Sequence, residues 1–299
     1  YVRLVPCSGI VDDGTRDIVT GYAYQDFVYS SGDRIQWVTS FSGDDVITTG
    51  AGHDRILTGG NDDTVHAGAG DDYVDGGVHE DALYGEAGSD VLLGGSGDDV
   101  VDGGDGNDNI RGGRQNDMLF GGAGDDVLQG DQDADIIDGG VGSDTASYSA
   151  AEAGVIVNLT LTTAQNTGGA GIDTLISIEN LQGSEFAGQL VGSATMNRIV
   201  GRQGADRIIG VAGGDRIDGA GGDDIIIGGA SRDVLYGGGG ADRFVFDDGH
   251  FGGLTANTAE NIRDFNGALG DRIDLRPVDG NSTTSVDDGF TFIGTTAFS

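Results

Sequence analysis

The sequence predicts an all-β fold: a parallel β-roll, of the β-helix or solenoid type, in two blocks with a strand-rich cap at the C-terminal end. Three observations lead to this prediction: a nine-residue repeat, a high content of glycine, and an aliphatic residue at a fixed place in each repeat. Gly supplies 59 of the 299 residues, whereas average proteins contain ~7% Gly. Units this short cannot bury an apolar face alone, so they must stack on one another.

The first block runs from residue 40 to residue 147 and divides into twelve consecutive nonapeptides without an insertion. Residues 94–102 form a regular unit with the sequence GGSGDDVVD. The eighth position is aliphatic in all twelve units, from Ile47 in the first to Ala146 in the last. The sixth position is Asp in every unit: Asp45, Asp54, Asp63, Asp72, Asp81, Asp90, Asp99, Asp108, Asp117, Asp126, Asp135 and Asp144.

Each nonapeptide is expected to contain a turn followed by a short strand. Its first six residues are rich in Gly, which tolerates the positive φ of tight turns, and its last three form the strand. Alternate residues of a strand face opposite sides, so the Asp at position six and the aliphatic residue at position eight both point inward. Two units make one coil, and alternate units stack in parallel about 4.8 Å apart. Six such layers form a roll roughly 30 Å long.

The charge of the chain predicts that a cation completes the fold. Acidic residues number 50 and basic residues 15, all of them Arg, so the formal net charge is −35. Such an excess destabilises a compact state, and one aliphatic side chain per nine residues cannot offset a backbone entropy of about 1–2 kcal/mol per residue. Ca²⁺ binds six to eight oxygens, from carboxylates and carbonyls alike. Each pair of stacked turns offers two Asp side chains and Gly-rich carbonyls, and GGxGxDxUx repeats are typical of calcium-binding β-helices.

A second block of seven nonapeptides runs from residue 183 to residue 245, and the predicted domain extends to residue 246. Its first two units carry Gly188 and Asn197 at the sixth position, and we expect these units not to bind calcium. The other five units carry Asp206, Asp215, Asp224, Asp233 and Asp242. The gaps between stacked turns predict up to about fifteen Ca²⁺ ions in the two blocks, whose charge of about +30 approaches the −35 of the chain.

Three turns of the first block depart from the GxGxD pattern, and calcium sites there are expected to be weak or empty. The departures are His79-Glu80, Gln115-Asn116 and Asp133-Ala134. Two plainer interpretations remain open: Asp is a common turn former, and a chain this acidic is disordered while no metal neutralises it. The constant place of Asp two residues before an inward aliphatic residue favours metal ligands over turn formers.

The remaining segments are assigned by their apolar patterns. Residues 1–39 are a cap for the first coil or the tail of an upstream domain. Residues 148–182 break the repeat and alternate like strands, both from Val155 to Leu161 and after a Gly-rich turn. Residues 247–299 form a C-terminal cap and secretion-related region. Its apolar segments are expected to pack on an outward stripe of the second block, and they contain Ile262, Phe265, Ile273, Leu275, Phe290 and Phe292. The stripe comprises Val191, Ile209, Ile225, Ile227 and Val245.

The repeats resemble those of the RTX (repeats-in-toxin) proteins, from about residue 40 onward. The C-terminal segments GGGGADRFVF, IRDF, GDRIDL and FTFIGTTAF resemble the C-terminal region of serralysin-type secreted metalloproteases. The resemblance implies a β-roll that folds in extracellular calcium and export by a type I secretion apparatus that reads an uncleaved C-terminal signal. It also implies an upstream effector domain, in keeping with a chain that begins at Tyr1 without a signal segment. The chain ends at Ser299, where such proteins usually continue, so the export signal is expected to be incomplete.

No catalytic residues are predicted in this chain. A zinc protease needs HExxH, but the only His-Glu pair is His79-Glu80, and Leu83 stands where the second His belongs. The single cysteine, Cys7, allows no internal disulfide. The acidity excludes nucleic acid as a partner, and no apolar stretch is long enough to span a membrane.

Three classes of function remain. The first is a secreted, calcium-dependent folding and export module attached to an effector. The second is the non-catalytic C-terminal part of a secreted enzyme, such as a metalloprotease. The third is a structural or adhesive cell-surface protein. The residues upstream of this chain in its gene discriminate among the three, because HExxH there selects the protease and further adhesin-like repeats select the surface protein.

Overall fold

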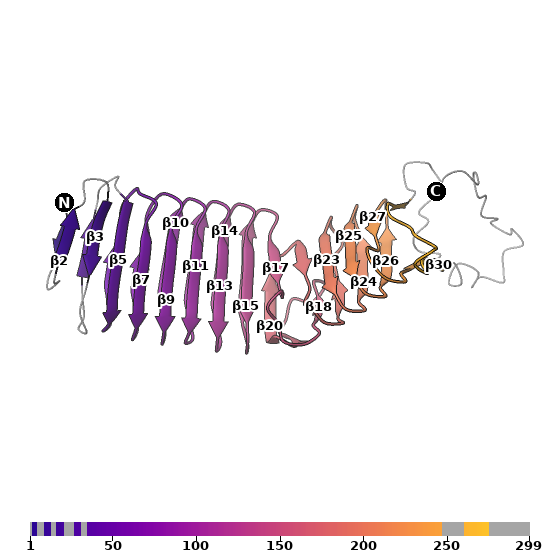
Figure 1. Ribbon diagram of the computed structural model, residues 1–299, viewed down its shortest axis with the longest axis horizontal. Coiled ribbons are helices and arrows are strands. Elements are labelled where there is room, and N and C mark those ends of the chain that lie inside the picture. Colours follow the sequence, from indigo (N-terminus) through magenta and orange to yellow (C-terminus); the bar gives the residue numbers. More distant parts are fainter. Residues whose placement is uncertain are drawn as a thin grey trace, which may run out of the picture.

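The computed structural model describes residues 2–4, 9–12, 16–20, 27–30, 35–246 and 260–274, and side chains from residue 36 onward. Within these ranges every regular element is a β-strand. The strands stack side by side into one long solenoid (Figure 1). The predicted all-β class and the parallel β-roll are therefore confirmed.

One sheet runs through both repeat blocks. It contains fourteen strands in sequential order. Their bounds are β2 (Gly9–Asp12), β3 (Arg16–Thr20), β5 (Ile35–Ser42), β7 (Arg55–Gly60), β9 (Tyr73–Val78), β11 (Val91–Ser96), β13 (Asn109–Arg114), β15 (Val127–Asp131), β17 (Thr145–Ser147), β21 (Asn180–Gln182), β23 (Arg198–Gln203), β25 (Arg216–Gly221), β27 (Val234–Tyr236) and β29 (Asn261–Ile262). We call it the continuous sheet.

Two shorter sheets face the continuous sheet in succession. The first has ten strands: β1 (Val2–Leu4), β4 (Phe27–Ser30), β6 (Val46–Thr48), β8 (Thr64–His66), β10 (Ala82–Ala87), β12 (Val100–Asp105), β14 (Met118–Ala123), β16 (Ile136–Val141), β20 (Gly171–Ile176) and β19 (Gln165–Gly168). The second has six strands: β18 (Ile156–Asn158), β22 (Gln189–Val191), β24 (Arg207–Ala212), β26 (Ile225–Ala230), β28 (Arg243–Val245) and β30 (Arg272–Asp274).

The stacking follows the predicted two-unit coil. Leu83 of β10 pairs with Val101 of β12, and Val101 pairs with Leu119 of β14, so each parallel neighbour lies one coil of 18 residues further along the chain. The same offset joins Ile199 of β23 to Ile217 of β25 in the second block. Every inward aliphatic residue therefore rests on its equivalent in the next coil.

The core is a thin column along the roll axis. The apolar residues at the eighth position are buried from Ile47 to Ala146 and again from Leu190 to Phe244. Outward residues at the seventh and ninth positions, such as Val100 and Asp102, remain partly exposed. The alternation predicted for positions six to nine is thus present.

Most strands are longer than the three residues predicted. In β12, for example, the strand begins at the seventh position, Val100, and ends at the third position of the next unit, Asp105. The reason is that Gly103, at the first position of that unit, continues the alternation and faces inward as a buried residue. The turn proper is confined to the fourth to sixth positions, residues 106–108 in this unit.

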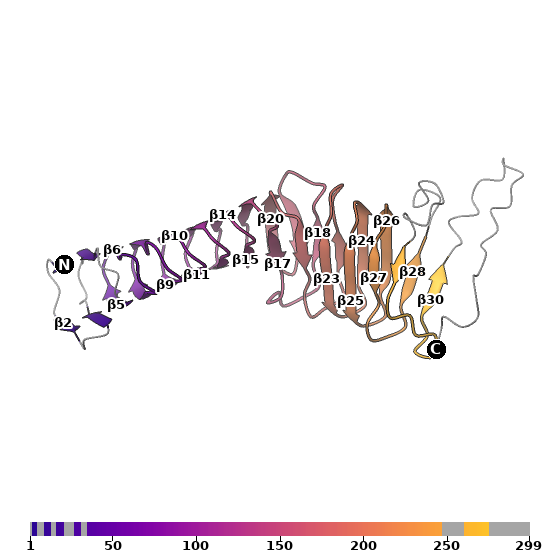
Figure 2. The same cartoon turned by 90° about the horizontal axis from the view of Figure 1, so that it is seen from above.

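Residues 148–182 form the joint between the two shorter sheets. β18 begins the six-stranded sheet by pairing with β22, whereas β19 and β20 form an antiparallel hairpin that ends the ten-stranded sheet. Val155 and Val157 are buried and Ile156 is exposed, as the alternating pattern predicted. In Figure 2 the sheets of the second block face the viewer while those of the first are seen edge-on, so the roll is turned about its long axis at this joint.

The described strands at both ends continue the coil. β3 pairs in parallel with β5, and β4 with β6. At the other end β29 pairs with β27 and β30 with β28, and Phe265 packs against Phe244 with ring centroids 6.4 Å apart. These segments extend the open end of the core and do not lie on the outward stripe. Two stripe residues, Val191 and Val245, are already buried. Leu275, Phe290 and Phe292 lie outside the described residues.

Candidate metal centres

The sixth-position Asp residues form buried columns along the two edges of the roll. Each of the seventeen predicted ligands is at most 3% exposed. In thirteen of the seventeen, the backbone N–H donates to Oδ1 of the Asp one coil further on, for example from Asp81 to Asp99 at 2.8 Å and from Asp206 to Asp224 at 2.8 Å. One carboxylate oxygen of each accepting Asp is therefore occupied by the stacking of the coils themselves.

The second carboxylate oxygen is buried and, in most units, unsatisfied. Within the described part of the chain, Oδ2 has no hydrogen-bond partner in Asp54, Asp63, Asp72, Asp81, Asp90, Asp99, Asp108, Asp117, Asp126, Asp135, Asp144, Asp206, Asp215, Asp224 and Asp242. A buried charged oxygen without a partner is costly. Fifteen of them in register are the arrangement expected where a cation supplies the missing contact.

In the units that begin with Gly, this first residue leaves space beside the free Asp oxygen. A methyl group added to Gly76 would lie 2.5 Å from Oδ2 of Asp81 and 2.8 Å from the carbonyl oxygen of Gly94. The same point beside Gly94 lies 2.5 Å from Oδ2 of Asp99 and 2.9 Å from the carbonyl oxygen of Gly112. We call this space the cradle. Its two oxygens lie close to the 2.3–2.6 Å at which Ca²⁺ takes its oxygen ligands.

The Asp carboxyls of the columns have raised pKa values because they are buried and lie close to one another. Burial raises the pKa of Asp72, Asp81 and Asp117 to about 8, and the carboxylates one coil away add to the rise. For Asp72 these neighbours are Asp54 and Asp90. Without a cation the folded columns would therefore take up protons near neutral pH.

The donor set selects the kind of metal. Within the described residues no three His, Cys, Asp or Glu side chains converge on one point. Backbone carbonyls must therefore provide most of the ligands of any ion in the turns. Ca²⁺ accepts such carbonyls, whereas Zn²⁺ prefers nitrogen and sulfur. Oxygen-only turns thus fit a hard cation.

The irregular units keep the backbone of the turn. His79, Gln115 and Asp133 occupy the fourth position, where regular units have Gly, and retain positive φ values of 82°, 77° and 79°. Residues with a Cβ are strained in this conformation. Stacking in the roll therefore holds these turns in shape, and weak or empty sites there remain a prediction.

The two units without a carboxylate differ from the others in their contacts. Asn197 accepts from the backbone N–H of Ser193 at 2.6 Å and donates its amide Nδ2–H to the carbonyl oxygen of Glu179 at 2.6 Å. The side chain thus uses its own hydrogen bonds where other units present a free oxygen. Gly188 has no side chain, and its backbone N–H donates to Oδ1 of Asp206 at 2.7 Å.

Four further carboxylates extend the columns beyond the repeats. Asp173 and Asp271 accept through Oδ1 from the N–H of Asp135 and Asp242. Glu179 and Glu260 accept through Oε2 from the N–H of Asp144 and Asp233, both at 3.0 Å. The nine-residue period did not predict these four residues, because the loops before them differ in length from those of the repeat. A shorter signal identifies all four: an acidic residue stands two positions before Leu175, Leu181, Ile262 or Ile273.

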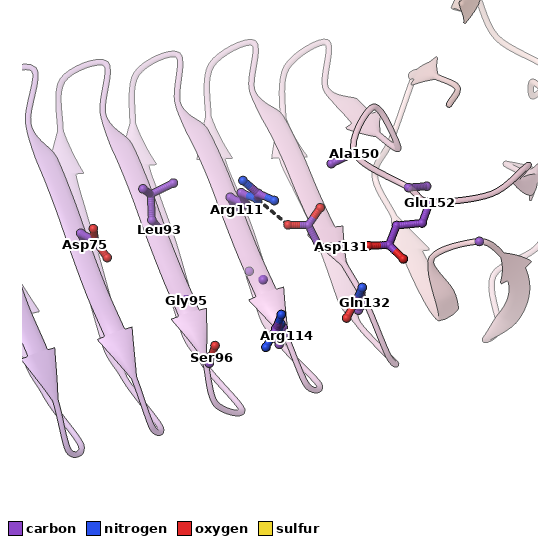
Figure 3. A pocket seen from close by; sticks show the side chains of 14 residues that line it. Asp75, Leu93, Gly95, Ser96, Arg111, Arg114, Asp131, Gln132, Ala150 and Glu152 are labelled. Carbon is purple, nitrogen blue, oxygen red and sulfur yellow. Dashed lines mark hydrogen bonds and ion pairs between the residues drawn. The ribbon is translucent and has the colours of Figure 1, made fainter. Parts of the chain in front are cut away.

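No catalytic grouping occurs among the described residues. His53 and His79 are exposed, and the His66 ring stacks on Tyr84 with centroids 4.8 Å apart. A groove on the outer face of the continuous sheet contains an ion pair between Arg111 and Asp131 (Figure 3), but no His or Cys lines it. The described residues include no helix long and apolar enough to cross a membrane.

Comparison with known proteins agrees with this geometry. The family model of the RTX calcium-binding nonapeptide repeat (4 copies) matches residues 39–74, 57–92, 75–110, 84–119, 111–146, 191–226 and 218–250. No curated protein matches the chain. The matched segments cover more than half of the chain and contain the seventeen stacked Asp turns. The chain therefore belongs to the RTX calcium-binding repeat proteins.

Proposed function

We propose that this chain is a calcium-dependent folding module that becomes ordered on secretion and stabilises or exports an attached effector. Its ligands are drawn from the seventeen sixth-position Asp residues together with backbone carbonyls of the turns. The observation that carries the proposal is the row of buried Oδ2 atoms without hydrogen-bond partners, twelve of the fifteen beside an open cradle. Up to about fifteen ions would offset most of the net charge of −35.

The same physics supports a location outside the cell. RTX repeat proteins are typically secreted, and extracellular modules bind calcium at about 10⁻⁴–10⁻³ M. At the much lower calcium concentrations inside cells, self-repulsion and the thin core keep the chain unfolded. An unfolded chain suits passage through a secretion apparatus, and a folded one suits an extracellular effector. The family match contains repeats only and gives no support to a protease as the effector.

The test is a calcium titration of the 299-residue chain. Far-ultraviolet circular dichroism should show little strand structure in a chelator and a cooperative gain of strand structure as Ca²⁺ rises into the millimolar range. Mg²⁺ at the same concentration is the matched control, because it demands octahedral geometry at 2.0–2.1 Å and retains its water. Identical spectra with and without the chelator would refute the proposal.

A further inference from the structure

The first residue of the repeat divides the nineteen units into two groups. The first four units of the first block begin with Ser40, Thr49, Thr58 and Ala67. Every later unit of both blocks begins with Gly. The first residue faces the inside of the turn, so the two groups differ in what fills the cradle.

The three hydroxyl side chains are buried and make the same contact. Ser40 Oγ donates to the carbonyl oxygen of Thr58 at 3.0 Å. Thr49 Oγ1 donates to the carbonyl oxygen of Ala67, and Thr58 Oγ1 to that of Gly76, both at 2.5 Å. In each case the acceptor belongs to the first residue of the unit one coil further on.

These acceptors are equivalent to the carbonyls that border the cradle in the Gly units. Beside Gly76 the cradle lies between Oδ2 of the Asp in the same unit and the first carbonyl of the next coil. Thr58 stands one coil earlier. Its hydroxyl donates its proton to the Gly76 carbonyl and lies beside the carboxylate of Asp63. The Thr49 hydroxyl likewise lies beside the carboxylate of Asp54. The hydroxyl therefore occupies the place that the Gly units leave open.

We propose that Ser40, Thr49 and Thr58 replace calcium with a side-chain hydroxyl, so that the first turns of the roll fold without an ion in the cradle. The proposal rests on the proposed function, because it assumes that calcium fills the open cradles. It removes Asp45, Asp54 and Asp63 from the cradle ligands and lowers the number of ions below fifteen. Ala67 fills the next cradle with a methyl group, which excludes an ion beside Asp72 but donates no hydrogen bond.

The consequence is an end of the solenoid that needs less calcium than the rest. In a repeat protein each unit is stabilised by its neighbours. Coils already closed by hydroxyls provide a surface on which the calcium-dependent coils from Gly76 onward can stack. The N-terminal coils should therefore gain order at lower calcium concentrations than residues 76–146.

Four variants of the full chain test the inference by the number of ions bound, measured by native mass spectrometry at saturating calcium. Thr58→Gly opens a cradle and should bind one ion more than the wild type. Gly76→Thr fills a cradle and should bind one ion fewer. Thr58→Val keeps the cradle filled without the hydroxyl, and Thr58→Ser keeps the hydroxyl, so both should leave the count unchanged. A gain of an ion in Thr58→Val, or an unchanged count in both Thr58→Gly and Gly76→Thr, would overturn the inference.

Hydrogen exchange of the wild-type chain gives a second measurement that does not depend on any variant. Amides of residues 36–66 should become protected at a lower calcium concentration than those of residues 76–146. Simultaneous protection of both ranges contradicts the inference while leaving calcium-dependent folding intact. A chain that binds no calcium and is protected in a chelator contradicts the proposed function instead, so the two failures are distinguishable.

Discussion

Each sixth-position Asp divides its two oxygens between two tasks. Oδ1 accepts the backbone N–H of the Asp one coil earlier, as Asp117 does from Asp99 at 2.9 Å. Oδ2 faces the cradle and finds no protein partner in Asp99 or Asp117. Asn can perform the first task but not the second, because its amide nitrogen carries protons and no charge. This distinction separates the stacking of the coils from the binding of the ion.

We expect Asp99→Ala and Asp126→Ala each to weaken calcium binding at one turn. Loss of a charged, buried oxygen costs about 1.5–3 kcal/mol, which is roughly a 10- to 100-fold loss of affinity at that site. Asn197→Ala is the matched control, since its amide makes only protein hydrogen bonds, and it should leave calcium binding nearly unchanged. Calorimetric titration provides the affinities, and equal losses in all three variants would disprove the assignment.

The raised pKa values predict competition between protons and calcium. Asp81 and Asp117 have pKa values of about 8 in the folded roll without a cation, against about 3.9 in an unfolded chain. Protons therefore bind the folded state more tightly, so the metal-free roll is most stable below about pH 4 and loses stability as the pH rises toward 8.

Calcium affinity should accordingly fall as the pH is lowered from 8 to 5, because protons must leave before the ion binds. Calorimetry at several pH values, in buffers of different ionisation enthalpy, measures both the affinity and the protons released. A calcium affinity that is constant over this range would show that the carboxylates are ionised before calcium arrives.

At the scale of the elements, the repeat was sufficient to predict the coil, the inward residues and the Asp columns. A period of nine with Asp and an aliphatic residue two apart allows one register only, because a slip by one residue would turn both outward. The longer strands were missed because Gly103 and its equivalents were assigned to the turn. Strands were expected in the joint, but their antiparallel pairing was not, because the hairpin β19–β20 replaces a repeat unit and leaves no periodic signal.

One Asp column ends at the joint between the two shorter sheets. There, protein groups donate hydrogen bonds to both oxygens of the last carboxylate. Asp173 is buried, and its Oδ2 accepts from the hydroxyl of Thr167 at 3.0 Å while its Oδ1 accepts from the N–H of Asp135. We expect Asp173→Ala to reduce the free energy of unfolding by about 1–3 kcal/mol without changing the number of bound ions. Thr167→Val should show part of the same loss. Denaturant unfolding at saturating calcium measures the loss, and a missing ion in Asp173→Ala would instead identify Asp173 as a ligand.

At the scale of the whole molecule, the described C-terminal strands act as additional coils. Asp264 accepts the N–H groups of Gly237 and Gly238, both at 2.9 Å, and Phe265 covers Phe244 at the end of the core. The described part of the predicted cap therefore stabilises the roll by covering the end of its apolar core. The part of the prediction that concerns residues 275–299 falls outside the described residues.

A chain that ends at Asp248 should need more calcium to order the second block than the complete chain needs. Nearest-neighbour coupling makes the loss fade with distance, so residues 40–147 should change little. Residue-resolved hydrogen exchange at a series of calcium concentrations measures both blocks in one sample. If residues 183–245 are protected equally in both chains, the C-terminal segment contributes nothing to the stability of the roll.

The continuous sheet also determines how the molecule bears load. Its fourteen strands are joined side by side through both blocks, and their hydrogen bonds run along the length of the roll. A force applied to the two ends would thus break the hydrogen bonds between one pair of neighbouring strands at a time. No large set of bonds would be sheared at once. The roll would yield at low force and in small steps, each releasing one coil of 18 residues, and would behave mechanically as an extensible tether.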